Sequence, residues 1–211
     1  MDKKKLFIIG AGELGREVGS WLNIIPETEK DYQVMGYLDN DSEALEGFNS
    51  PFKVLGSEAD FDFPENSWVI IAISNVHTRK KIFEYLKGKV QFYNFIHPTA
   101  ILGINVEIAE GCLIMPYVVI TTNIIIGKSV FINIGSVVGH DSAIGDFCSL
   151  APHTDLGGHV KLGDLVTLST KTTIAPRQKV GSEAFIGSGS VVLRNIPAGG
   201  NAVGNPVKII S

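Results

Sequence analysis

Residues 131–160 read FINIGS VVGHDS AIGDFC SLAPHT DLGGHV, and these five hexads carry one pattern. The second position of each hexad is aliphatic, the third is mostly small, and the fourth and fifth hold the Pro, Asp, Lys and His residues. The same register continues in both directions without interruption, and every second position from Leu102 to Val192 is aliphatic. So long a run does not arise by chance, and the region is a repeat with a period of six residues.

Each hexad predicts one short strand followed by a corner. The aliphatic side chain points inward, the small third residue allows the chain to coil tightly, and the polar pair lies at the turn. Three hexads make one coil of a triangular prism, so residues 18 apart in the sequence stack on one another. Residues 101–196 therefore predict a parallel β-helix of about five coils.

The first 95 residues follow a different pattern, in which short β-rich runs alternate with helical ones. This order predicts a small parallel sheet with helices on its faces, a Rossmann-like α/β arrangement. The predicted strands are Leu6–Ile9, Val34–Leu38, Trp68–Ile73 and Gln91–Phe95, and the predicted helices are Leu14–Leu22 and Val76–Leu86. We therefore expect two domains, residues 1–95 and residues 96–211.

The composition is that of a globular protein without an excess of positive charge. The formal net charge is -4, which gives no electrostatic reason to expect a nucleic-acid partner. The apolar run Leu6–Ile9 near the N-terminus is too short for a signal peptide or a membrane helix. The two cysteines, Cys112 and Cys148, form no disulfide-rich pattern, so we expect a reducing, cytoplasmic setting.

A glycine-rich turn, GAGELG at residues 10–15, follows the first predicted strand and opens the first predicted helix. Backbone N–H groups at such a helix start suit a phosphate, and Asp39 follows at the end of the next strand. This is the context of a dinucleotide fingerprint. Taken alone, the turn leaves two interpretations open, an NAD-binding site and a purely structural tight turn.

The two halves together resemble the sugar O- and N-acyltransferases of the PglD and NeuD type, within the hexapeptide-repeat superfamily. The residues that carry the resemblance are the glycine turn, Tyr37-Leu38-Asp39-Asn40, Ile71-Ala72-Ile73-Ser74-Asn75, Ile96-His97-Pro98, Gly139-His140-Asp141 and Val203-Gly204-Asn205-Pro206. The resemblance covers nearly the whole chain. It implies a left-handed β-helix, acetyl-CoA as the co-substrate without a metal, and an N-terminal domain that holds a nucleotide-sugar.

On this resemblance, the acceptor is the amine of a nucleotide-linked amino sugar. Asp39 and Asn40 would contact the uridine or the ribose, and residues 74 and 75 would line the same crevice. The expected substrate-binding residues are Gly10, Gly12, Gly15, Asp39, Asn40, Ser74 and Asn75.

His140 is the expected general base. It lies at a predicted corner directly before Asp141, and the family's catalytic base matches this position in the phrase SVVGHD, residues 136–141. A neutral imidazole can take the proton that an amine loses when it attacks a thioester, and Asp141 could orient the ring and favour its protonated form. The other histidines are expected in caps, in packing or at solvated corners: His77, His97, His153 and His159.

Further candidates come from stacking and from the resemblance. Gly158 lies one coil after position 140, and its N–H could donate to the thioester oxygen, as a backbone amide does at the matching place in the family. Asn133, a third catalytic candidate, lies at a different corner, so it either serves the site from a neighbouring subunit or is satisfied within its own coil.

On the same resemblance, CoA would run past Thr170 and Ser188. Basic residues at this end could hold its phosphates or form a solvated surface: Lys171, Arg177, Lys179, Arg194 and Lys208.

The uninterrupted hexads send out no loop that could cover His140, so we expect a homotrimer in which a neighbouring subunit completes the site. Three alternatives stay open. The first is an O-acetyltransferase that acts on a sugar or a sialic acid. The second is a metal-dependent lyase of the γ-carbonic-anhydrase type, for which His140, His153 and His159 are the available ligands. The third is a non-catalytic nucleotide-binding module.

Overall fold

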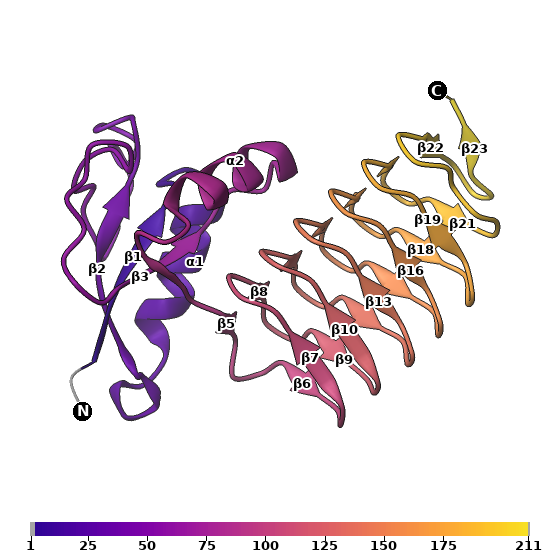
Figure 1. Cartoon of the computed structure of the whole chain (residues 1–211), viewed down its shortest axis with the longest axis horizontal. Helices are drawn as coiled ribbons and strands as arrows, with labels where there is room; N and C mark the ends of the chain where they lie inside the picture. Colours follow the sequence, from indigo (N-terminus) through magenta and orange to yellow (C-terminus); the bar gives the residue numbers. More distant parts are fainter. Residues whose placement is uncertain (1–2, 211) are drawn as a thin grey trace. The chain divides into compact units, whose positions relative to one another are not determined.

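The computed structural model describes residues 3–210, and the chain divides into two compact units with the boundary between Tyr93 and Asn94 (Figure 1). The first unit contains both α-helices among the described residues, and the second consists of short strands. Within residues 3–210, no helix is both long enough and apolar enough to cross a bilayer.

The first unit is a four-stranded parallel sheet with two helices. Its elements are β1 (Lys4–Ile9), α1 (Glu13–Ile24), the 3-10 helix η1 (Glu27–Glu29), β2 (Tyr32–Leu38), β3 (Ser67–Ile71), α2 (Val76–Leu86) and β4 (Gln91–Phe92). The strand order is β2-β1-β3-β4, so the direction of the connections reverses between β1 and β3. In sheets of this kind, ligands bind outside the carboxyl ends of the strands at the point of reversal.

The predicted strand Gln91–Phe95 is divided in the structure. Only Gln91–Phe92 pairs with the first sheet, whereas β5 (Phe95–Ile96) pairs with the second unit. The side chain of Asn94 explains the division, because its Oδ1 accepts the N–H of Cys112 at 2.9 Å and attaches the chain to the β-helix. The alternation of polar and aromatic residues in QFYNF, residues 91–95, does not reveal this change of sheet.

Helix α1 lies close to the sheet because two of its positions are glycine. A Cβ atom at Gly15 would lie 2.0 Å from the carbonyl oxygen of Gly10. A Cβ atom at Gly19 would lie 1.9 Å from the hydroxyl oxygen of Tyr37. Neither distance is sterically possible, so Gly15, predicted as a substrate-binding residue, allows the helix to pack, as the third glycine of the fingerprint does.

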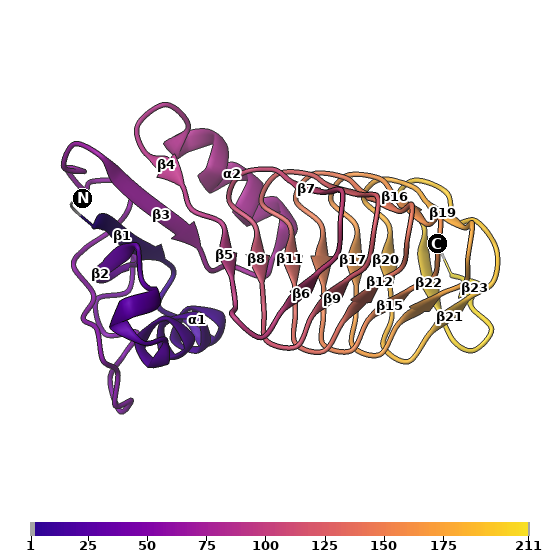
Figure 2. The same ribbon diagram turned by 90° about the horizontal axis from the view of Figure 1, so that it is seen from below.

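The second unit is a left-handed parallel β-helix with three sheets (Figures 1 and 2). The eight-stranded sheet contains β5 (Phe95–Ile96), β8 (Leu113–Ile114), β11 (Phe131–Ile132), β14 (Ser149–Leu150), β17 (Thr167–Leu168), β20 (Phe185–Ile186), β22 (Asn201–Val203) and the antiparallel β23 (Lys208–Ile209). The six-stranded sheet contains β6 (Ile101–Leu102), β9 (Val119–Ile120), β12 (Val137–Val138), β15 (Asp155–Leu156), β18 (Thr173–Ile174) and β21 (Val191–Val192). The five-stranded sheet contains β7 (Val106–Ile108), β10 (Ile124–Ile126), β13 (Ala143–Ile144), β16 (Lys161–Leu162) and β19 (Lys179–Val180).

The strands stack with the predicted offset. Val138 pairs with Ile120 on one side and with Leu156 on the other, each 18 residues away. The β-helix has about six turns rather than the five predicted. The difference arises at the two ends of the β-helix, where β5 pairs with β8 and β22 pairs with β20. Strands β5 and β22 lie outside residues 101–196, the hexads used for the prediction.

The second position of the hexads fills the interior. From Ile114 to Val192 each of these aliphatic side chains is at most 5% exposed, whereas Leu102, in the first coil, is 36% exposed. The fifth position has a positive φ in every hexad from residue 105 to residue 189. These residues are Asn105, Gly111, Tyr117, Asn123, Ser129, Gly135, Asp141, Phe147, His153, His159, Leu165, Lys171, Arg177, Glu183 and Gly189.

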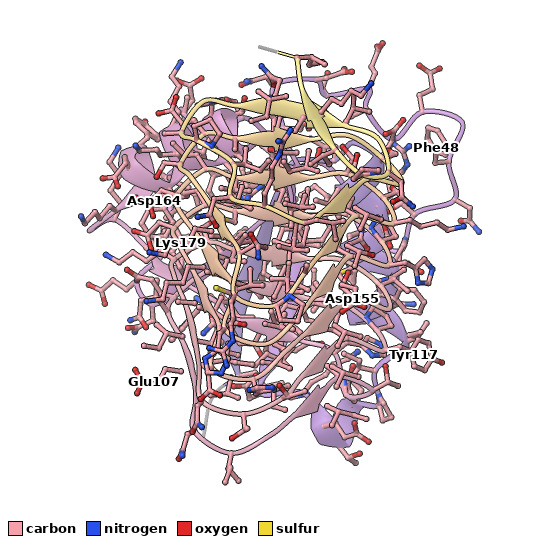
Figure 3. The ribbon with its side chains drawn as sticks, turned by 90° about the vertical axis from the view of Figure 1, so that its right-hand side faces the viewer. Phe48, Glu107, Tyr117, Asp155, Asp164 and Lys179 are labelled. Carbon is pink, nitrogen blue, oxygen red and sulfur yellow. The ribbon has the colours of Figure 1, made fainter. Side chains whose placement is uncertain are left out.

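This left-handed conformation turns the chain at each corner, although Gly, Asn and Asp tolerate it best. Because bulkier residues such as Phe147 also adopt it, the coil imposes the corner backbone whatever the side chain. In Figure 3 the coils lie one behind another, and the labelled Asp164 and Tyr117 point outward from different corners. The side chains at the corners therefore determine the chemistry of each edge.

Candidate active site

His140 and Asp141 form the corner that follows β12. The Nδ1 atom of His140 lies 2.7 Å from the Oδ2 atom of Asp141, which is hydrogen-bonding distance. The two adjacent side chains can meet because Asp141 has the left-handed backbone of the corner, with a φ of 58°. The His140 side chain is 57% exposed, so the ring is accessible from solvent.

The hydrogen-bond partner of Nδ1 determines which nitrogen of the His140 ring carries the proton. A carboxylate only accepts, so Nδ1 carries the proton in the neutral ring and Nε2 has the free lone pair. The hydrogen bond from His140, and after it the one from Asn123, lowers the pKa of Asp141 below its ordinary value. Asp141 is therefore ionised at neutral pH, where it can stabilise a protonated His140.

Polar side chains stack on Asp141 from the neighbouring coils. Asn105 donates from Nδ2 to Oδ1 of Asn123 at 3.0 Å, and Asn123 donates from Nδ2 to Oδ1 of Asp141 at 3.1 Å. On the other side, Nε2 of His159 lies 3.7 Å from Oδ2 of Asp141. These four stacked residues and His140 belong to the corner row that follows the six-stranded sheet, which we call the histidine row.

His159 belongs to this cluster, although the sequence indicated a solvated corner. Its ring stands at 82° to that of His140, with the centroids 5.2 Å apart. The ligand atoms of His140, Asp141 and His159 all lie within 4.8 Å of one another. This is not the set expected for a metal-dependent lyase, because His153 lies in the corner row that follows the eight-stranded sheet.

Gly158 lies against the ring of His140, one coil along, as the stacking predicts. A Cβ atom at this position would lie 2.6 Å from Nε2 of His140, so glycine leaves the space that the ring needs. The next N–H, that of His159, donates to the carbonyl oxygen of His140 at 2.8 Å. Within residues 3–210, the N–H of Gly158 donates to no acceptor, so a free donor lies beside the candidate base.

Asn133, Thr170 and Ser188 lie at another corner, after strands of the eight-stranded sheet. The side chain of Asn133 accepts the N–H of Ile134 at 2.7 Å, so it is satisfied within its own coil. Thr170 and Ser188 stack one above the other. One chain therefore does not bring these three residues to His140. The five basic candidates are all exposed: Lys171, Arg177, Lys179, Arg194 and Lys208.

The first unit has a cavity of about 380 Å³ at the carboxyl ends of its strands. Gly10 lines it, and the polar side chains in its lining are Asp39, Asn40, Glu58, Thr78, Lys81 and Tyr85. The sequence interpretation missed Glu58, Thr78, Lys81 and Tyr85. The last three, Thr78, Lys81 and Tyr85, come from one face of α2. Their spacing of three and four residues within a predicted helix was the available signal.

Asp39 also supports the glycine turn. Its Oδ2 accepts the N–H of Ala11 at 2.7 Å, and its Oδ1 accepts the N–H of Asp41 at 3.0 Å. Asn75 is instead the N-cap of α2, where its side chain accepts the N–H of Thr78 at 2.9 Å. Among the residues that the structure describes, four of the predicted substrate-binding residues do not line this cavity: Gly12, Gly15, Ser74 and Asn75.

Three comparisons with known proteins extend these observations. The family model of the PglD N-terminal domain matches residues 5–86. WeeI from Acinetobacter baumannii AYE is 30% identical, with 98% of this chain and 99% of that chain covered and a TM-score of 0.84. The chain belongs to the PglD-type sugar acetyltransferases of the hexapeptide-repeat superfamily.

Two more members of this group have solved complexes. PerB from Caulobacter crescentus, in complex with CoA and GDP-perosamine, is 27% identical, covers 98% of this chain and 97% of its own, and has a TM-score of 0.86. The acetyltransferase domain of PglB from Neisseria gonorrhoeae FA1090, in complex with acetyl coenzyme A, is 25% identical, with coverages of 99% and 100% and a TM-score of 0.86. A comparison with curated proteins finds no match.

Membership of this family confirms the predicted fold and the predicted class of enzyme, an acetyltransferase. The likeness spans both units, because each solved relative covers nearly the whole chain. It therefore does not favour a metal-dependent lyase or a non-catalytic nucleotide-binding module.

Proposed function

We propose that this protein transfers the acetyl group of acetyl-CoA to the amine of a nucleotide-linked amino sugar, with His140 as the general base. The observation that carries the proposal is the 2.7 Å contact between Nδ1 of His140 and Oδ2 of Asp141 at an exposed corner. Support also comes from related structures that contain CoA with GDP-perosamine, or acetyl coenzyme A. One relative of this kind is described as a perosamine N-acetyltransferase, which favours nitrogen over oxygen as the acceptor atom.

The reaction begins when the amine attacks the carbonyl carbon of the thioester. Nε2 of His140 takes a proton from the attacking nitrogen as the N–C bond forms, and Asp141 stabilises the imidazolium. The free N–H of Gly158 donates to the carbonyl oxygen as negative charge develops on it. The C–S bond then breaks, the proton on Nε2 passes to the thiolate sulfur, and neutral His140 is restored.

The cavity of the first unit is the proposed site for the nucleotide. Lys81 supplies a positive charge for the phosphates, and the N–H groups at the start of α1 add donors. Asp39 and Asn40 offer acceptors for the ribose or the base. The reversal of strand order between β1 and β3 supports this placement.

Acetyl-CoA binding is assigned to Gly158 beside His140 and to Thr170 and Ser188 of a neighbouring copy in a homotrimer, which would also bring the catalytic candidate Asn133. Asn133, Thr170 and Ser188 share a corner row that differs from the row of His140, so a second chain would bring the two rows together. We place the enzyme in the cytoplasm, where acetyl-CoA and nucleotide-sugars are available. A monomer with full activity at micromolar concentration would contradict the trimer.

The acceptor is tested by incubating the protein with acetyl-CoA and a panel of GDP- and UDP-linked amino sugars. Free amino sugars and nucleotide-sugars that carry a hydroxyl in place of the amine are the controls. Thiol release and the product mass should show acetylation of a nucleotide-linked amine. Transfer only to the hydroxyl analogues, or to no acceptor, would contradict the proposal.

The nucleotide site is tested separately with Asp39→Ala. Loss of one charged acceptor should raise the KM for the nucleotide-sugar about tenfold and leave the KM for acetyl-CoA unchanged. Equal losses on both substrates would indicate a folding defect and argue against a nucleotide role for Asp39.

A further inference from the structure

The carboxylate of Asp141 lies between two imidazoles. Its Oδ2 atom is 2.7 Å from Nδ1 of His140 and 3.7 Å from Nε2 of His159. Rotation about the Cβ–Cγ bond would allow the group to bond either ring, since both rings are within reach of one oxygen. Arg177 continues the same row one coil beyond His159 and adds a positive charge on that side. A further interaction is therefore needed to keep the Asp141 carboxylate hydrogen-bonded to His140 rather than to His159.

The other carboxylate oxygen, Oδ1, is held by Asn123. The amide nitrogen of Asn123 donates to it at 3.1 Å, and the amide oxygen of Asn123 accepts from Nδ2 of Asn105 at 3.0 Å. Because an ionised carboxylate only accepts, the –NH₂ group of Asn123 must face Asp141 and its oxygen must face away. The charge on Asp141 thus defines the direction of the whole ladder from Asn105 to Asp141.

The backbone fixes the starting points of these side chains. Asn105, Asn123 and Asp141 all have the left-handed conformation, with φ between 55° and 58°. The N–H of Asn123 donates to the carbonyl oxygen of Ile104, and that of Asp141 donates to the carbonyl oxygen of Thr122. Asn and Asp are among the residues that best tolerate this conformation, so the ladder forms without added strain.

We propose that Asn123, held in turn by Asn105, is a positioning residue that directs the Asp141 carboxylate to His140 and away from His159. The proposal rests on the proposed function of His140 as the base. Asn123 acts through Asp141: when the Oδ1 contact is lost, the carboxylate is shared between the two rings. The tautomer and orientation of His140 are then less well defined, and proton transfer slows.

The test is a double-mutant cycle between Asn123→Gly and Asp141→Asn. Glycine keeps the positive φ and removes the amide. Asn123→Gly alone should lower kcat about three- to tenfold, the effect of one ordinary hydrogen bond, with both KM values nearly unchanged, because Asn123 acts on the base only through Asp141. In the Asp141→Asn background it should cause no further loss, because the carboxylate through which it acts is absent.

Three further variants sharpen this cycle. Asn105→Gly should lower kcat by about twofold, since it acts on Asn123 only. Asn123→Asp keeps the shape but replaces the donor to Asp141 with a second carboxylate, so it should lower kcat at least as much as Asn123→Gly does. Glu183→Gly is the matched control, because Glu183 is exposed at a fifth position of another row with a φ of 62°. It should leave kcat unchanged.

Wild-type kcat in Asn123→Gly would overturn the inference, and so would losses that multiply in the double variant, because they would show a role independent of Asp141. The proposed function fails in a different way. If His140→Ala keeps full activity, His140 is not the base. If His140→Ala is inactive while Asn123→Gly is fully active, only the positioning role is wrong.

Discussion

Two corner rows of the β-helix share one backbone and use their side chains in opposite ways. In the histidine row, side chains bond to side chains, as Asn123 does to Asp141. In the row after the five-stranded sheet, which we call the capping row, three successive side chains each accept the N–H of the residue one coil earlier. These contacts join the N–H of Lys128 to Asp146 at 2.8 Å, that of Asp146 to Asp164 at 2.8 Å, and that of Asp164 to Ser182 at 3.1 Å.

The difference lies at the fourth position of the hexad. The capping row has a side-chain acceptor at 146, 164 and 182, whereas the histidine row has Gly158 and Pro176 at the equivalent places. Neither of these two residues has a side-chain acceptor, so the N–H of Gly158 is not capped. We infer that the capping row stabilises the coil, while the histidine row leaves donors and acceptors free for a substrate.

The largest effect within this comparison is expected from Asp141→Asn. The imidazole of His140 remains, but the charge that stabilises its protonated form is lost, so kcat should fall roughly 10- to 100-fold. Asp146→Asn is the matched change in the capping row and should leave kcat within about twofold of wild type. Steady-state kinetics of the two variants, at equal folded concentration, check the contrast. Equal losses would remove the distinction between the rows.

Pro176→Asp converts the histidine row into a capped row. The new carboxylate should accept the N–H of Gly158, as Asp164 accepts that of Asp146. Because one donor for the oxyanion is then occupied, kcat should fall about tenfold or more. Pro176→Ala adds no acceptor and should keep wild-type kcat. Unchanged activity in Pro176→Asp would show that the Gly158 N–H plays no part in catalysis.

The reverse test removes a cap. Asp146→Ala deletes the acceptor of the Lys128 N–H, so the free energy of unfolding should fall by about 1 kcal/mol while kcat stays unchanged. Denaturant unfolding and kinetics on the same preparation measure both. A loss of activity in the folded variant would mean that the capping row contributes to the site.

The smallest expected effect concerns the pH dependence of stability. The pKa of Asp141 is lowered in the folded chain, by the hydrogen bond from His140 first and by that from Asn123 second. A lowered pKa stabilises the fold above the unfolded value of about 4, and this contribution is lost as the pH falls through the folded value. The difference in unfolding free energy between wild type and Asp141→Asn should therefore be present at pH 7 and shrink below about pH 4. A difference that grows toward low pH would contradict the sign.

The sequence predicts the β-helix well because its signal is periodic and local. Each second-position aliphatic specifies an inward side chain, and an offset of 18 residues specifies which residues stack. The same offset located Gly158 beside His140. Applied to Asp141, it would also have located Asn123 and His159, which the sequence interpretation left aside because it considered corner residues one at a time.

The first unit is less predictable because its contacts are not periodic. Asp39 and Asn40 line the cavity as expected, but Asn75 caps α2 and Gly15 allows α1 to pack. The sequence of a glycine turn does not show whether its residues contact a ligand or a neighbouring strand. The spacing of Thr78, Lys81 and Tyr85 shows that they share one face of α2, but the packing of α2 that brings this face to the cavity is not specified by a single sequence.

The most direct test of the account is acetyl transfer by His140→Ala, measured beside wild type with acetyl-CoA and a nucleotide-linked amino sugar across a range of pH. Loss of the base should lower kcat roughly 10²- to 10⁴-fold. The fold should be retained, because the exposed side chain of His140 contributes little to the core. Near-normal activity of the variant with an unchanged pH profile would contradict the assignment of this corner as the active site.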